Sequence, residues 1–182
     1  VTCGQAAQVA AGDTVRITTD RYAGRMWPLE RHLALVLSSS FDLLRGTGTL
    51  VLFGDATYSG ATTIDAGTLQ IGDGGTGGAL GGTSGVTNNG TLAFNHSDSL
   101  THSAAISGTG SLTKNGTGAL TLSGSNSYTG GTTLNTGTLV IGNANALGTG
   151  TLTQTDGTST VSIGTTGTVS NTMSLYNVSA TE

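Results

Sequence analysis

Apolar and polar residues alternate in short stretches along the later part of the chain, most clearly from Gly116 to Gly142, which reads GTGALTLSGSNSYTGGTTLNTGTLVIG. Leu120 and Leu122 are two positions apart, as are Leu139 and Ile141, so each pair shares one face of a strand. Glycines separate these stretches and supply backbone angles that other residues reach only with strain. The pattern predicts a short strand, a turn, a threonine-led strand, a glycine corner and a third strand.

The same unit occurs earlier in the chain, where residues 46–72 read GTGTLVLFGDATYSGATTIDAGTLQIG. The two copies align without a gap, and more than half of their positions are identical. We interpret the shared glycine, aliphatic and tyrosine positions as structural repeat positions. In the first copy they are Gly46, Gly48, Leu50, Leu52, Gly54, Tyr58, Gly60, Gly67, Leu69 and Ile71, and in the second copy they are Gly116, Gly118, Leu120, Leu122, Gly124, Tyr128, Gly130, Gly137, Leu139 and Ile141. Asn126 is a further repeat position of the second copy.

A glycine, a threonine or serine and a leucine recur in that order beyond the two copies, and several of these recurrences lie about twenty residues apart. Such a period is typical of one coil of a parallel β-solenoid, in which each rung must stack on its neighbours to bury its apolar face. The alternative is a β-sandwich of antiparallel hairpins. Hairpin turns favour Asn-Gly pairs, and such pairs occur at Asn89-Gly90 and Asn115-Gly116. Because the aligned copies contain no such pair, we favour an all-β parallel solenoid.

Residues 1–45 differ from the rest of the chain, since they hold five of the six cations and few glycines. We therefore place a domain boundary near Arg45, with the solenoid over residues 46–182. Alternation predicts a strand over Thr14–Thr18, and apolar spacing after Pro28 predicts a short amphipathic helix. Such a helix would cap the open end of the stack; the alternative is that residues 1–45 are a non-native segment ahead of the repeats.

Charge and cysteine content exclude several classes of function. The net charge is −4 and Lys114 is the only lysine or arginine after Arg45, so nucleic-acid binding is not expected. Cys3 is the single cysteine, which excludes an intrachain disulfide. The chain stops at Glu182 without an element that would cover the last rung, and we expect it to be a fragment of a longer protein.

Titratable side chains gather at one place in the repeat region, the segment Asn95-His96-Ser97-Asp98 with His102 nearby. His96 and Asp98 would share a strand face, and His102 is the only further ligand identified nearby, so a metal site is one interpretation. We favour a solvated loop. The carboxylates elsewhere are dispersed along the sequence, so we predict no catalytic residue, no cofactor and no metal, and we expect that the chain is not an enzyme.

The second copy resembles the passenger-associated transport repeat, also called the autotransporter-associated β-strand repeat, of bacterial type V secretion. The resemblance rests on the glycines, leucines, Asn126 and Tyr128 of that copy. The first copy has Ala56 where the pattern has asparagine, so an asparagine ladder is in doubt there. The resemblance covers residues 46–72 and 108–150 well and does not extend to residues 1–45.

This resemblance implies a right-handed parallel β-helix in the passenger of an autotransporter. It implies a location at the bacterial cell surface, outer membrane-associated or secreted, and a C-terminal outer-membrane β-barrel of the same full-length protein as partner. Family passengers carry adhesins and other cargoes, so a host-surface or glycan ligand would fit. We therefore expect a structural stalk segment that supports secretion and display; the alternative is part of a polysaccharide-binding or polysaccharide-cleaving β-helix protein whose active site lies elsewhere.

Overall fold

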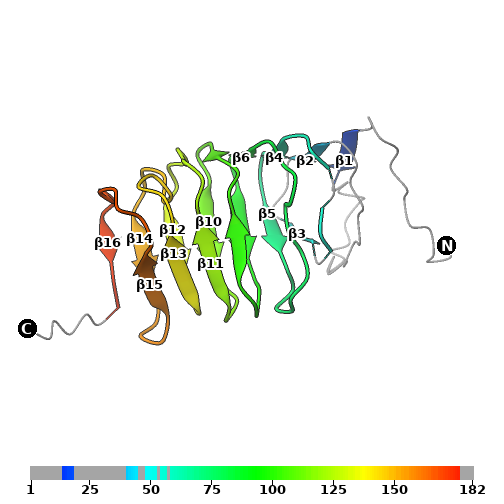
Figure 1. Cartoon of the computed structure of the whole chain (residues 1–182). Helices are drawn as coiled ribbons and strands as arrows, with labels where there is room; N and C mark the ends of the chain where they lie inside the picture. Colours follow the sequence, from blue (N-terminus) through cyan, green and yellow to red (C-terminus); the bar gives the residue numbers. More distant parts are fainter. Residues whose placement is uncertain (1–13, 19–39, 45–47, 53, 57, 177–182) are drawn as a thin grey trace, which may run out of the picture.

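The chain winds into a stack of short strands, shown in Figure 1. The computed structural model describes residues 14–18, 40–44, 48–52, 54–56 and 58–176. The strands are β1 (Thr14–Thr18), β2 (Ser40–Leu44), β3 (Thr49–Leu52), β4 (Thr62–Ile64), β5 (Thr68–Ile71), β6 (Val86–Asn88), β7 (Thr91–Phe94), β8 (Leu100–His102), β9 (Ile106–Ser107), β10 (Ser111–Lys114), β11 (Ala119–Leu122), β12 (Thr132–Leu134), β13 (Thr138–Ile141), β14 (Leu152–Gln154), β15 (Thr160–Ile163) and β16 (Met173–Ser174).

These strands form three sheets that run along the stack. The first sheet has the strand order β1-β2-β4-β6-β9, the second β16-β14-β12-β10-β7-β5-β3, and the third β15-β13-β11-β8. Every strand pairing among the described residues is parallel. Parallel neighbours need a long connection, and here that connection is the rest of one coil.

One coil therefore passes around the stack before the chain returns to the same sheet. In the second sheet Leu92 pairs with Leu112, Leu112 with Thr132 and Thr132 with Leu152, each one coil further along the chain. The result is a β-solenoid of about 6 turns. This confirms the predicted all-β parallel solenoid and excludes the sandwich of antiparallel hairpins.

The described residues of the N-terminal segment join this stack. β1 coincides with the strand predicted over Thr14–Thr18, and it pairs with β2, which pairs with β4. The first sheet thus crosses the boundary that we predict near Arg45, and the division into two domains stays a prediction. The capping helix predicted after Pro28 lies outside the described residues.

Within the described part of the chain, no helix is long and apolar enough to cross a membrane.

The core is a set of columns of inward side chains, one above another along the stack. In β10, β11, β12 and β13 the residues alternate between buried and partly exposed, as an alternating sequence predicts. Each rung therefore buries its apolar side against the rungs on either side of it. One column of the second sheet holds Leu50, Leu69, Leu92, Leu112, Thr132 and Leu152.

The two copies of the repeat lie on different sheets. Leu50 of the first copy is in the second sheet, whereas its counterpart Leu120 is in the third sheet. Thr62 is likewise in the first sheet and its counterpart Thr132 in the second. Three coils lead from Leu50 to Leu112, and Leu120 follows on the next side of the coil. The sequence separation between the copies is therefore three coils and one side, so the second copy is rotated about the solenoid axis by one side relative to the first.

Candidate functional site

The inward aliphatic repeat positions of each copy belong to the buried columns on which the stack depends, in the second sheet for the first copy and in the third sheet for the second. The aliphatic positions of both copies, predicted from the alternation, are all buried: Leu50, Leu52, Leu69, Ile71, Leu120, Leu122, Leu139 and Ile141. Within each copy they pair across one coil, because the pairing joins Leu50 to Leu69 and Leu120 to Leu139. Stacking is the interaction that this geometry supports most directly.

Each copy also contains a buried hydrogen bond between a tyrosine and the threonine four positions later. The hydroxyls of Tyr58 and Thr62 are 2.5 Å apart, and so are those of Tyr128 and Thr132. Burial raises the pKa of Tyr58 and raises that of Tyr128 to about 12, although the threonine bond opposes the rise. Both phenols therefore stay protonated and fill a corner inside the coil. Sequence reasoning missed this pair, and the Y-x-x-x-T spacing common to both copies is the signal that could have revealed it.

Asn126 ties together three successive coils. Its side-chain oxygen accepts a hydrogen bond from the amide of Ile106 at 2.8 Å, and its side-chain nitrogen donates to the carbonyl of Ala146 at 2.6 Å. Ala56, its counterpart, has no polar side chain, and its backbone amide donates to the carbonyl of Ala79 at 2.8 Å. The asparagine bridge is therefore present in the second copy and lacking in the first, as the sequence difference indicates.

Close contacts between coils explain why glycines lie at the corners. A Cβ atom placed on Gly118 would overlap the carbonyl oxygen of Asp98 in the preceding coil. Gly67 and its counterpart Gly137 both have a φ of 75°, a conformation that costs other residues strain. Gly46 lies outside the described residues. The glycines thus let one corner rest directly on the next.

The histidine cluster is not the solvated loop that we expected. His96 and His102 are only 3 % and 5 % exposed, although Ser97 and Asp98 between them are exposed. The expectation was wrong because a polar segment between two strands does not have to leave the stack. Here the coil continues through the segment, and both imidazoles lie inside.

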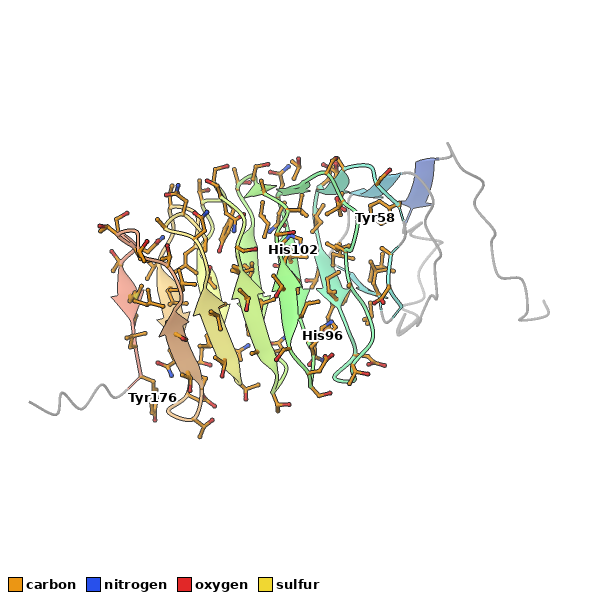
Figure 2. The ribbon with its side chains drawn as sticks, viewed as in Figure 1. Tyr58, His96, His102 and Tyr176 are labelled. Carbon is orange, nitrogen blue, oxygen red and sulfur yellow. The ribbon has the colours of Figure 1, made fainter. Side chains whose placement is uncertain are left out.

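The two histidines have different surroundings. Nδ1 of His96 is 3.1 Å from a carboxylate oxygen of Asp98, whose side chain is 45 % exposed. The ring of His102 lies against Phe94, with 5.6 Å between ring centroids. Burial lowers the pKa of His102 to about 4. Figure 2 shows the two histidines at separate places on the stack.

The described residues offer little for metal chemistry. No group of three or more histidine, cysteine, aspartate or glutamate side chains is arranged to hold an ion among them. Nε2 of each histidine is buried without a hydrogen-bond partner, and the two rings do not converge on one point. We assign no catalytic role to this arrangement.

Lys114 occupies an inward position in an otherwise uncharged column. It pairs with Phe94 on one side and Leu134 on the other, and it is 1 % exposed. Its ammonium donates hydrogen bonds to the carbonyls of Gly116 and Thr136, the latter at 3.3 Å, and burial lowers its pKa. The side chain therefore joins two neighbouring corners, a role that no periodic signal predicts.

Comparison with known proteins supports a structural assignment. The family model for the passenger-associated transport repeat matches residues 45–71 and 112–141. Neither the search of curated proteins nor the search of solved structures gave a significant match. The matched segments contain buried columns, the tyrosine–threonine bonds and the corner glycines described above. Two segments of the chain, residues 45–71 and 112–141, therefore match the passenger-associated transport repeat.

Proposed function

We propose that this segment is a β-helical stalk that supports the secretion and surface display of an autotransporter passenger. One observation carries the proposal: the two copies of the repeat lie on different sheets but share the inward pairing of their aliphatic residues and the buried tyrosine–threonine bond. A shared binding surface would require both copies to face the same way. What the two copies have in common is the interior, so the feature encoded twice is stacking.

The manner of stacking suits export as an unfolded chain. Each coil contacts only the coils next to it, so a coil can fold onto those already formed without waiting for distant parts of the chain. No intrachain disulfide is needed, since Cys3 is the single cysteine. The partner would be a C-terminal outer-membrane β-barrel of the same full-length protein, and the location the cell surface or the medium.

A display experiment tests this function. The chain is fused between a secretory signal peptide and an autotransporter barrel, produced in a Gram-negative bacterium, and probed on intact cells with an externally added protease. We expect the wild-type segment to reach the surface in a protease-resistant form. Retention in the periplasm, with the barrel inserted normally, would contradict the proposal.

A matched pair of variants separates folding from sequence-specific recognition. Leu122→Asp disrupts the inward column, whereas Thr121→Asp changes the outward side of the same strand. Display of the Thr121 variant together with loss of the resistant form in the Leu122 variant would tie export to stacking. Equal display of both variants in resistant form would show that stacking does not support this step.

A further inference from the structure

The basic side chains of the repeat region are concentrated in one coil. After Arg45 the sequence contains two histidines and one lysine and no arginine, and all three lie in residues 95–114, which we call the basic coil. The basic coil begins after β7 and runs through β8 and β9 to the end of β10, in the middle of the described stack (Figure 1). Each of the three side chains is buried.

Two of these three groups have partners that suit a positive charge. The ammonium of Lys114 donates to the carbonyls of Gly116 and Thr136, and the imidazole of His96 lies 3.1 Å from the carboxylate of Asp98. The imidazole of His96 therefore has a carboxylate neighbour that reaches solvent.

His102 lacks such a partner. Its Nε2 atom is buried without a hydrogen bond, and its ring is packed against Phe94. In the third sheet it pairs with Leu122 of β11, which carries no titratable residue. Residues 79–83 of the preceding coil contain no charged residue either. This segment and His102 both contribute to the lining of a cavity of about 90 Å³. The nearest carboxylate along the chain, that of Asp98, is bonded to His96.

We propose that the basic coil is an acid-labile joint, at which the solenoid opens when the pH falls while the coils on either side remain stacked. Protonation of His102 would place an imidazolium in an apolar column with no carboxylate to receive it, and the cavity beside it offers a path for water. Since each coil contacts only its neighbours, the disturbance falls first on the two interfaces of this coil.

The direction of the effect follows from the two protonation states. In the unfolded chain His102 has an ordinary pKa near 6.5, and burial lowers it to about 4 in the folded state. Between these values the unfolded form therefore binds more protons than the folded form. The free energy of opening at His102 is thus highest above pH 6.5 and decreases progressively as the pH falls toward 4. At a pH of about 4.5 this difference favours opening at His102 by roughly 70-fold relative to a pH of about 7.5.

Hydrogen exchange followed by mass spectrometry tests the joint. Protection factors of the wild-type chain are compared at pH 7.5 and pH 4.5, after correction for intrinsic exchange rates. We expect protection to fall by roughly 70-fold in β7, β8, β10 and β11 and to change little in β13 and β14. Loss of protection spread evenly over the stack, or no loss at pH 4.5, would overturn the proposal.

Variants at the two histidines provide the control. His102→Leu and His102→Phe should both abolish the acid response, since neither side chain titrates and both suit an apolar column. His96→Gln should retain the response, because the trigger is His102. If a His102 variant that is folded at pH 7.5 still loses protection in the basic coil at pH 4.5, or if His96→Gln abolishes the response, the assignment to His102 is wrong.

Discussion

Thr121 and Leu122 are neighbours in β11 but lie on opposite sides of the third sheet. Leu122 is fully buried between His102 and Ile141, whereas Thr121 is partly exposed. We expect Leu122→Asp to destabilise the chain by several kcal/mol, because a carboxylate without a partner would be buried. Thr121→Asp should cost much less. Circular dichroism during thermal unfolding measures both, and equal losses of β-structure would show that the inward and outward positions are misassigned.

The tyrosine–threonine pair makes a second prediction for single residues. Thr132 lies between Leu112 and Leu152 in an apolar column, and its hydroxyl is satisfied by Tyr128. Tyr128→Phe and Thr132→Val should each cost about 1–3 kcal/mol, since each leaves one buried hydroxyl without a partner. The double variant should cost less than the sum of the single variants. Additive losses in chemical denaturation would mean that the two hydroxyls are not coupled.

At the scale of the element, the glycine corners decide how closely one coil approaches the next. Gly118 rests on the backbone of Asp98, whereas the nearest atom to a Cβ on Gly85 would be the Ala105 carbonyl oxygen at 3.5 Å, an ordinary contact. Gly118→Ala should therefore lower stability by about 1–3 kcal/mol through displacement of the corner. Gly85→Ala should be nearly neutral. A larger drop in melting temperature for the Gly85 variant would contradict this account of the corners.

Strands were predictable from the sequence because their signal is local. The alternation at Leu120 and Leu122 determines which side chains are inward, and the regular recurrence of the glycine–threonine–leucine triplet indicates parallel stacking. The sheet to which each strand belongs was not predictable in the same way. It depends on the summed length of every preceding corner, and those lengths vary: the coil from Leu69 to Leu92 is longer than the coil from Leu92 to Leu112.

The polar residues of the interior were the least predictable part. His102 and Lys114 occupy inward positions where their neighbours in the column are apolar, so the pattern provides no reason to bury them. Their burial follows from contacts with other parts of the stack, namely Phe94 for His102 and the carbonyls of two corners for Lys114. Asn126 was recognisable as a repeat position, but its hydrogen-bond partners lie one coil away in either direction.

For the whole molecule, the unit of folding is the coil and not the repeat copy. Removal of residues 116–135 excises one coil, since Lys114 pairs with Leu134, and it leaves the following strand, β13, on the third sheet. Removal of residues 116–142 excises more than a coil, so residues 143–150, which normally follow a strand of the third sheet, would follow β10 directly. We expect the shorter deletion to melt cooperatively and the longer one to aggregate, because its apolar strand faces lack partners.

Size-exclusion chromatography and thermal unfolding distinguish the two deletions. A monomeric, cooperatively melting chain without residues 116–142, beside an aggregated chain without residues 116–135, would contradict the assignment of the coil as the folding unit. The comparison is stringent because the longer deletion removes a complete copy of the repeat, which a repeat-based view would expect the chain to tolerate.

The rotation of the second copy by one side of the solenoid, relative to the first copy, has a genetic consequence. Because the two copies align without a gap, an exchange between their coding segments would remove or add the whole stretch that separates them in one event. Since that stretch is three coils and one side, the resulting stalk would remain stacked, but every surface after the crossover would point in a direction one side further around the axis. A single recombination could thus change both the reach of the stalk and the direction in which it presents whatever follows.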